Sequence, residues 1–303
     1  MQQQQPPASV RAVTIRFADL RVTNLPPPPT RRCQLSGDRS KDLGGFIEEG
    51  FGPRGLGIVS IADVSDATVL QRLRPMQHEQ ISISISLDFE LTCGSAFALC
   101  TQVPGYPELR KRLLLLAPRH ISICRPNIWP TDHLPELEIA FKDLGKLMLE
   151  VGLMLAHHCD RYVMQKGVEQ YIGESLEKTL ANSRCPKGPN RMEFNLFRHG
   201  LTCGLFTRKS EEVPCPDIGT GLYVRTRDNQ VVKVTFEDDE LVYQIGESAE
   251  ILSRGHLCAT PHCVKAPSSE SASDVDRSTF VLFIQPDWDE LLKLPSEIRY
   301  YKE

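Results

Sequence analysis

The feature that most constrains the fold of this chain is one long amphipathic helix. Pro135 suits the first turn of a helix, with Thr131 or Asp132 as candidate caps, and the helical pattern continues to about Asp160. Apolar side chains recur there at steps of three and four residues and form one stripe: Leu137, Phe141, Leu144, Met148, Val151 and Leu155. Roughly 26 residues at ~1.5 Å each give about 40 Å, which is long enough to cover a whole sheet.

The last third of the chain has the pattern of short strands. Residues 222–225 and 231–234 are joined across Asp228-Asn229, which is a hairpin signal. Further strands are expected at 241–245, 256–264 and 279–284. Because helices come first and strands follow, we expect an α+β fold whose strands form a sandwich or a jelly roll.

The segments before and after the long helix carry weaker patterns. Residues 1–40 are expected to be disordered, because runs of glutamine and proline cannot pack into a core. The other expected elements are a helix at 41–49, a glycine-rich turn at 50–57, strands at 58–61 and 80–87, and a helix at 171–182.

Composition excludes several classes of protein. The 303 residues are 41% hydrophobic and 24% charged, as in an ordinary globular protein, and the net charge of -4 argues against nucleic acid as a partner. No apolar run approaches the roughly 18 residues of a membrane span, and the first residues do not form a secretory signal. The ten cysteines follow no disulfide framework, so we expect a cytoplasmic protein with free thiols.

A histidine and an arginine on successive strands indicate half of a metal and carboxylate site. His262 could bind iron(II) through a neutral imidazole, and Arg277 could hold a dicarboxylate in a two-pronged ion pair. Such a site needs a second imidazole and a carboxylate from upstream to complete a facial triad. The adjacent His157 and His158 are not expected to supply them, because neighbours on a helix lie about 100° apart. We expect both to face water.

Four motifs in register carry a family resemblance. They are Gly221-Leu222-Tyr223-Val224, Gln244-Ile245-Gly246-Glu247, Thr260-Pro261-His262 and Arg277-Ser278-Thr279. In this order and spacing the chain resembles the non-haem iron(II), 2-oxoglutarate-dependent dioxygenases, within the isopenicillin N synthase-like branch of plants and algae. The resemblance implies one domain over 41–303, a double-stranded β-helix (jelly roll) with N-terminal supporting helices, and a jelly-roll half over 191–303. It also implies that His262 binds iron(II) and that Arg277 and Thr279 hold 2-oxoglutarate.

The chain departs from the family pattern where the first metal ligands belong. The family has His-x-Asp shortly before a strand that here corresponds to 201–206, and Arg191 and Glu193 occupy those places instead. A guanidinium stays protonated and cannot bind a metal. Glu193 and His199 are the candidate replacements. Residues 65–102 also read as an insertion, and family-like sequence breaks off after 117–119, so we expect an incomplete jelly roll.

Two functions follow from these observations. The first is an iron(II) and 2-oxoglutarate-dependent dioxygenase that oxidises a small organic substrate with a degraded metal site. The second is a catalytically inactive relative or aberrant isoform, which serves as a binding module or has no function. Because loops and pocket shape determine the substrate, no motif here identifies it.

Overall fold

The computed structural model describes residues 8–21, 42–64, 97–102, 111–115, 135–168, 197–201, 205–208, 211–265 and 275–284. Its helices are α1 (Phe17–Leu20), α2 (Gly44–Phe51), α4 (Leu137–Gln165) and α6 (Glu247–Leu252). Its strands up to the middle of the chain are β1 (Ser9–Arg11), β2 (Val13–Arg16), β3 (Ile58–Ala62), β4 (Phe97–Gln102) and β5 (Lys111–Leu115). The remaining strands are β6 (Phe197–Leu201), β7 (Leu205–Arg208), β8 (Glu211–Glu212), β9 (Gly221–Arg225), β10 (Val231–Thr235), β11 (Leu241–Ile245), β12 (His262–Lys265) and β13 (Asp276–Ile284).

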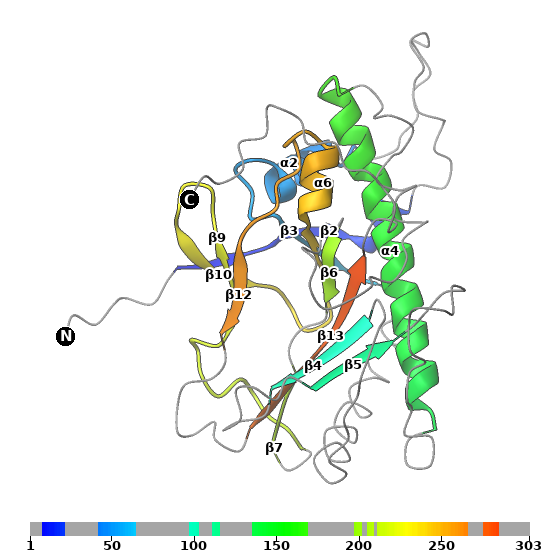
Figure 1. The fold of residues 1–303 in the computed structure, drawn as a ribbon, viewed down its shortest axis with the longest axis vertical. Coiled ribbons are helices and arrows are strands. Elements are labelled where there is room, and N and C mark those ends of the chain that lie inside the picture. Colours follow the sequence, from blue (N-terminus) through cyan, green and yellow to red (C-terminus); the bar gives the residue numbers. More distant parts are fainter. Residues whose placement is uncertain are drawn as a thin grey trace, which may run out of the picture.

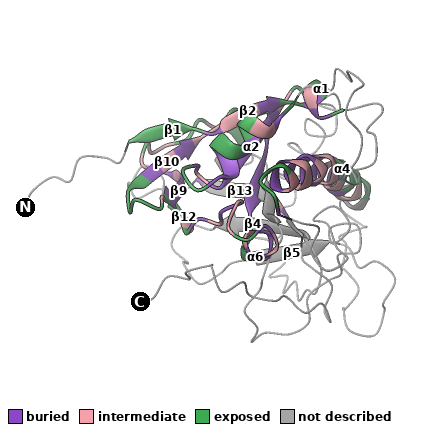
Figure 2. Ribbon diagram, turned by 90° about the horizontal axis from the view of Figure 1, so that it is seen from above, coloured by how far each residue is buried: buried purple, intermediate pink, exposed green. Residues whose placement is uncertain are grey.

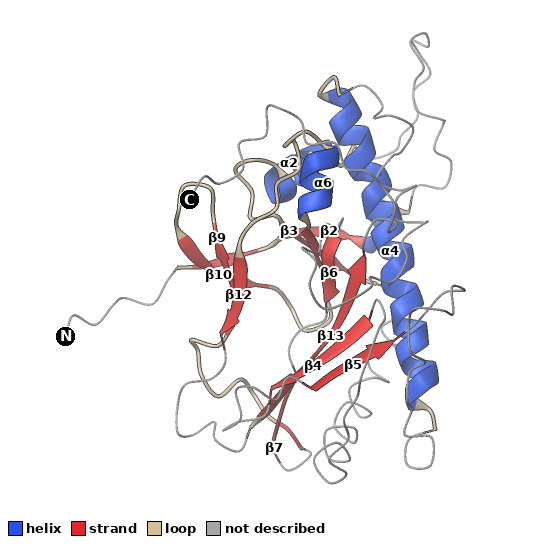
Figure 3. Cartoon of the chain, viewed as in Figure 1, coloured by secondary structure: helices blue, strands red, loops and turns tan. Residues whose placement is uncertain are grey.

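Two sheets and one long helix form the layers of the protein (Figures 1 and 3). The larger, nine-stranded sheet runs in the order β2-β3-β11-β6-β13-β4-β5, with β7 and β8 joined to it through β13. The smaller sheet has the order β1-β10-β9-β12. In Figure 1 the smaller sheet lies on the left, the larger sheet in the middle and α4 on the right. The mixed α and β content expected from the sequence is confirmed.

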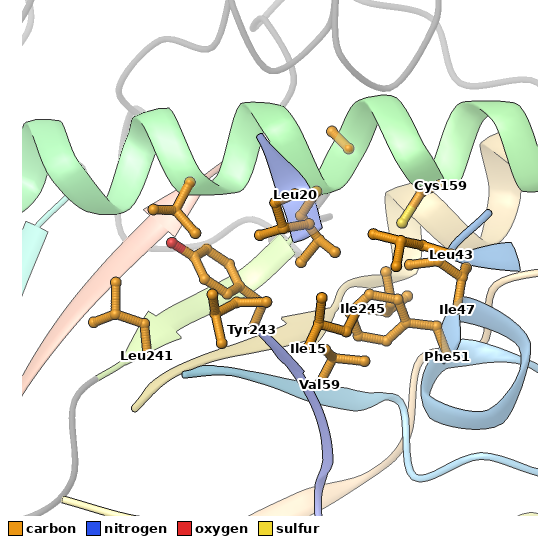
Figure 4. Close-up of a cluster of buried hydrophobic side chains, with 14 of the residues drawn as sticks. Ile15, Leu20, Leu43, Ile47, Phe51, Val59, Cys159, Leu241, Tyr243 and Ile245 are labelled. Carbon is orange, nitrogen blue, oxygen red and sulfur yellow. The ribbon is translucent and has the colours of Figure 1, made fainter. Parts of the chain in front are cut away.

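The helix α4 covers one face of the larger sheet. Its bounds confirm the helix predicted from the apolar stripe and extend it to Gln165. The buried stripe packs against alternate residues of the sheet, including Ile15, Val59, Leu241, Tyr243 and Ile245 (Figure 4). The Tyr243 hydroxyl donates a 2.6 Å hydrogen bond to the Met148 carbonyl oxygen, which ties the helix to β11. Alternation along each strand is what sends these residues to one face.

The other face of the larger sheet packs against the smaller sheet. Ile58 and Val242, which alternate with the residues under α4, meet an apolar cluster from the smaller sheet. That cluster contains Leu222, Val224, Val232 and Val234. Figure 2 shows that parts of β9 and β10 are buried. The space between the two sheets is therefore a second core, and we call the two faces that line it the inner faces.

The N-terminal segment contradicts, at residues 8–21, the expectation of disorder over residues 1–40; the rest of that range lies outside the described residues. Residues 8–21 form β1, β2 and α1, and Ile15, Phe17 and Leu20 are buried in the main core. β1 pairs in parallel with β10, and β2 pairs in parallel with β3. The prediction was wrong because Val13-Thr14-Ile15-Arg16 alternates like a strand, although it lies close to a run of glutamines and prolines.

A histidine of α4 also differs from expectation. His158 is buried instead of facing water, and its Nε2 lies 3.3 Å from the carbonyl oxygen of Leu20. Burial lowers the pKa of His158 below its ordinary value, and the hydrogen bond to Leu20 opposes that shift only in part. The ring lies at the contact between α4 and α1, so the last turns of α4 pack on the N-terminal segment.

Other predicted elements are confirmed or lie outside the described residues. The hairpin between β9 and β10 is present, and Asn229 adopts a positive φ of 66° in its turn. Residues 80–87 and 171–182 lie outside the described residues. Of the predicted insertion at 65–102, residues 97–102 form β4, which pairs with β13. In the part of the chain that the structure describes, no helix is long and apolar enough to cross a membrane.

Candidate functional site

His262 begins β12 at the inner face of the smaller sheet. β12 pairs with β9 in antiparallel register, and His262 lies opposite Val224. Val224 is fully buried in the core between the sheets. Because directly opposite residues of an antiparallel pair share a face, the half-buried His262 side chain belongs to the same interior. The expected strand 256–264 is shorter than predicted, since only 262–265 join the sheet.

Gln244 reaches His262 from the opposite sheet. It lies on β11 between Tyr243 and Ile245, which face α4, so its own side chain projects to the inner face. The Gln244 side chain is fully buried, and its Nε2 lies 2.6 Å from Nδ1 of His262. The same Nδ1 lies 3.1 Å from the carbonyl oxygen of Thr260. Gln244 Oε1 has no hydrogen-bond partner among the described residues.

The loop that leads into His262 is anchored at three points. The Cys258 amide donates to the carbonyl oxygen of Phe51 at 2.7 Å, and the Ala259 amide donates to Glu250 Oε2 at 2.7 Å. The Thr260 hydroxyl then donates to the carbonyl oxygen of Leu56 at 2.7 Å. These bonds connect the loop to α2, to α6 and to the turn before β3. They hold the backbone immediately before His262 in one place.

The turn beneath this loop explains one of the glycines noted in the sequence. Gly57 has a positive φ of 68°, and a Cβ atom there would lie 2.7 Å from Thr260 Oγ1 and 2.8 Å from the Cys258 carbonyl oxygen. Both distances are shorter than a carbon atom can adopt without displacing its neighbour. The loop before His262 therefore packs directly on a position that only glycine fills without strain.

The other predicted site residues are placed only by their strands. Arg277 and Thr279 lie on β13 of the larger sheet, opposite Gln102 and Cys100 of β4. His199 lies on β6, in the register position opposite Gln244. Glu193 lies outside the described residues. The structure thus brings His262 and Gln244 into contact and puts the backbone of His199 next to that of Gln244.

The chain contains one His-x-Asp, and it does not serve as the missing ligand pair. It is His158-Cys159-Asp160 on α4, where residues two apart point roughly 200° away from each other. Cys159 is fully buried between them, and His158 is held by Leu20. In the ranges that the structure describes, no three His, Cys, Asp or Glu side chains are grouped so as to hold a metal ion.

Cys258, which lies in the anchored loop, has a thiol of low reactivity. Burial is the main cause that raises the pKa of the Cys258 thiol to about 11. Its Sγ donates to the Gly255 carbonyl oxygen at 3.3 Å. Because the thiolate is the form that binds metals and attacks electrophiles, Cys258 is suited to neither role near neutral pH.

The geometry around His262 fits one ligand of a metal site. A metal-binding histidine commonly uses one ring nitrogen for the metal while the other is held by a carbonyl or carboxylate. The carbonyl oxygen of Thr260, 3.1 Å from Nδ1 of His262, is a partner of this kind and would leave Nε2 for a metal, whereas the Gln244 atom at Nδ1 is the amide donor Nε2. The unpartnered oxygen of Gln244 is a second polar atom in the same interior. Sequence reasoning found His262; it included Gln244 in the motif Gln244-Ile245-Gly246-Glu247 but did not predict its contact with His262.

Comparison with known proteins relates the fold to one group of enzymes. No protein-family model matches the chain, and no curated protein sequence matches it. Among solved structures, a protein assigned to the 2OG-Fe(II) oxygenase family from Caulobacter crescentus has a TM-score of 0.53 at 16% identity, over 94% of this chain and 89% of the other. A full-length protein of Neurospora crassa in complex with alpha-KG has a TM-score of 0.55 at 10% identity, over 94% and 88%.

A third solved structure is similar over most of both chains. It is JOX2 in complex with 2OG, Fe and JA, with a TM-score of 0.50 at 12% identity, over 96% of this chain and 79% of the other. At identities this low the similarity is one of fold. The chain therefore shares its overall fold with these solved structures.

Proposed function

Because this chain shares the fold of the 2OG-Fe(II) oxygenases, we propose that it is an iron(II) and 2-oxoglutarate-dependent dioxygenase of the isopenicillin N synthase-like kind, with an altered metal site. One observation carries the proposal. His262 lies at the inner face of the smaller sheet, and its Nδ1 lies 3.1 Å from the Thr260 carbonyl oxygen, the kind of partner that a metal-binding histidine commonly has. The two packed sheets are proposed to form a jelly roll.

Three residues are proposed to hold the metal. His262 would bind iron(II) through Nε2, and His199 and Glu193 would replace the missing His-x-Asp. The register supports His199, because its position lies opposite Gln244, whose side chain reaches His262. Opposite positions in an antiparallel pair share a face of the sheet. Imidazole and carboxylate ligands are the set that non-haem iron(II) oxygenases use.

Two residues of β13 are proposed to hold the cosubstrate. Arg277 and Thr279 lie two positions apart on β13 of the larger sheet. A guanidinium can pair with the distal carboxylate of 2-oxoglutarate through two hydrogen bonds, and a hydroxyl can donate a third. When bound, iron(II) and 2-oxoglutarate would supply the oxidation of a substrate C–H bond by oxygen. The residues of the chain orient these groups and exclude water.

The substrate is proposed to be a small organic molecule. The JOX2 structure contains JA, and a second structure of the Neurospora crassa protein contains 5-formyluracil. Cys159, Cys215, Cys258 and Cys263 are free thiols, in keeping with the cytoplasmic location that we propose.

Anaerobic titration with iron(II) and 2-oxoglutarate tests the proposal. We expect a visible metal-to-ligand charge-transfer band that requires both components and that is lost in His262→Ala. His256→Ala is the matched control, because His256 lies in the loop before β12 and is not proposed as a ligand. Absence of the band from folded wild-type protein, or its persistence in His262→Ala, would rule out the proposed site.

The second candidate function is a catalytically inactive relative or an aberrant isoform. It is favoured by Arg191 and Glu193, which stand where the family has its first metal ligands. Such a protein would show no thermal shift with iron(II) and 2-oxoglutarate. A true ligand at 100 times its Kd would stabilise the fold by about 2.7 kcal/mol, which a melting curve resolves. Sequencing the cDNA across residues 64–65 and 102–103 tests the isoform explanation, which an uninterrupted transcript contradicts.

A further inference from the structure

Glu250, in the short helix α6, contacts both the turn between β9 and β10 and the loop that leads into His262. Its Oε2 accepts a 2.7 Å hydrogen bond from the Ala259 amide, and its Oε1 pairs with the Arg227 guanidinium. We infer that Glu250 is a positioning residue, which holds the backbone before His262 so that the imidazole has one fixed place in the site. The inference rests on the proposed function, because it gives His262 the role of a metal ligand.

The backbone before His262 is held by hydrogen bonds to other segments. β12 begins at His262, so residues 258–261 lie outside the strand. The Pro261 carbonyl oxygen accepts a 2.8 Å hydrogen bond from the Arg225 amide at the end of β9. Together with the three anchors described above, the partners of residues 258–261 are Phe51, Glu250, Leu56 and Arg225. Of these four bonds, only the one to Glu250 ends on a carboxylate, and charge-assisted hydrogen bonds are roughly twice as strong as neutral ones.

The Glu250 carboxylate is itself fixed in place. Its side chain is only 12% exposed, and each of its oxygens has a partner, Arg227 for Oε1 and the Ala259 amide for Oε2. A carboxylate that is largely removed from water is costly unless charged and hydrogen-bonding groups compensate it, and here both kinds do so. The Glu250 carbonyl oxygen also accepts from the Gly255 amide at 2.9 Å, where the chain leaves α6. The carboxylate therefore ties the hairpin turn and the loop to one helix.

A displacement of this loop would reach His262 through a short and stiff connection. Only Thr260 and Pro261 separate Ala259 from His262, and the ring of a proline fixes its φ. The Thr260 carbonyl oxygen, which lies 3.1 Å from Nδ1 of His262, belongs to the same backbone. The loop thus determines both where the histidine starts and where one partner of its ring lies. Because a metal needs its ligands at fixed distances, a looser loop should lower metal affinity without removing a ligand.

A small set of variants separates positioning from stability. Glu250→Leu removes both bonds, and Glu250→Gln is the conservative variant, because its amide oxygen can still accept from Ala259. Glu247→Leu is the matched control, since Glu247 is an exposed carboxylate in the first turn of the same helix. Leu155→Ala destabilises the protein at α4, away from the loop. Arg227→Leu releases Oε1 but keeps the carboxylate, so it should act in the same direction with a smaller effect, and it carries the test if circular dichroism shows that Glu250→Leu is unfolded.

The first readout is NMR of the metal-free protein. We expect hydrogen exchange of the Ala259 amide to become at least about 10-fold faster in Glu250→Leu, the factor that corresponds to one hydrogen bond to a charged group, and to stay unchanged in Glu247→Leu. The ring signals of His262, assigned with His262→Ala, should shift or broaden in Glu250→Leu and not in Leu155→Ala. Unchanged His262 signals in Glu250→Leu would overturn the inference. This measurement needs no metal, so it decides the role of Glu250 even if the proposed function fails.

The second readout is affinity for Co(II), used as an air-stable substitute for iron(II) and measured by calorimetry. Loss of a group that orients a ligand lowers metal affinity by about 10–100-fold, and because Glu250 acts through the backbone we expect a drop of about 10-fold in Glu250→Leu. Glu250→Gln should bind more tightly than Glu250→Leu. Unchanged affinity in Glu250→Leu, with binding lost in His262→Ala, would refute positioning, and so would an equal drop in Leu155→Ala. No binding by wild-type protein would refute the proposed function instead.

Discussion

Replacing Gly57 with alanine is expected to destabilise the protein through the loop that holds His262. The backbone at Gly57 has a φ of 68°, and placing a residue with a Cβ there costs about 1–2 kcal/mol. The new Cβ would also lie 2.7 Å from Thr260 Oγ1 and 2.8 Å from the Cys258 carbonyl oxygen. Overpacking of this kind costs about 1–3 kcal/mol, so we expect Gly57→Ala to lower the free energy of unfolding by about 2–5 kcal/mol.

The backbone around Gly57 leaves little room for relaxation. Its amide donates to the Gly50 carbonyl oxygen at 2.9 Å, and its own carbonyl oxygen accepts from the Ile245 amide at 3.0 Å. The neighbour that can move is therefore the loop at 258–260, which leads directly into His262. We expect Gly57→Ala to weaken metal binding as well as stability.

A matched glycine isolates the steric part of the effect. Gly255 also has a positive φ, of 81°, but a Cβ there would meet nothing within 4 Å. Gly255→Ala should therefore lose only about 1–2 kcal/mol, from the backbone conformation alone. Urea unfolding of wild type and both variants at one pH measures the difference. If Gly57→Ala were no less stable than Gly255→Ala, the claimed contact between the Gly57 turn and the loop would be wrong.

Three further substitutions test the packing around α4. Burial lowers the pKa of His158, so the unfolded state binds a proton more readily than the folded state does. The free energy of unfolding should therefore fall as pH decreases through and below ~6.5, by at most ~1.4 kcal/mol per pH unit. His158→Gln should remove that part of the pH dependence in urea unfolding; an unchanged pH profile would refute it. Tyr243→Phe leaves the Met148 carbonyl without its hydroxyl donor and should lower the free energy of unfolding by about 1–3 kcal/mol. An unchanged free energy of unfolding would mean that this hydrogen bond is absent. Leu155→Ala should cost about 2–5 kcal/mol, because Leu155 is fully buried, and a thermal melt like that of wild type would contradict the packing of α4.

The parts of the fold that the sequence predicts are those with strong local periodicity. The stripe of α4 and the apolar run of β11 extend over enough residues to specify a helix and a strand without tertiary information. The hairpin of β9 and β10 contains Asp228-Asn229, a pair of residues typical of a tight hairpin turn. Each of these patterns can be recognised in the sequence without knowing which surface the element packs against.

The parts that escaped prediction depend on distant partners. β1 contains three exposed residues, and only its pairing with β10 makes it a strand. Residues 256–261 are apolar enough to suggest a strand, but bonds to Phe51, Leu56 and Glu250 hold them as a loop instead.

The candidate site likewise has a part that the sequence predicts and a part that depends on distant partners. His262 stands in a motif, so its position on a strand could be predicted from Thr260-Pro261-His262. The contact between Gln244 and His262 could not be predicted, although Gln244 also stands in a motif, because that contact exists only when two sheets face each other. Arg277 and Thr279 lie together on β13, a strand that the sequence predicted from residue 279 onward. Their roles and those of Glu193 and His199 stay predictions.

The N-terminal segment links the two sheets within a few residues, and this has a consequence for synthesis on the ribosome. β1 joins the smaller sheet and β2 the larger, with Ala12 between them. The Thr235 hydroxyl donates to the carbonyl oxygen of Val10, 225 positions earlier in the chain. At about 5–20 residues per second, β1 is made roughly ten to forty-five seconds before its partner strand. β1 must therefore wait, without its partner strand, until β10 has emerged, and the smaller sheet cannot form before that point in translation.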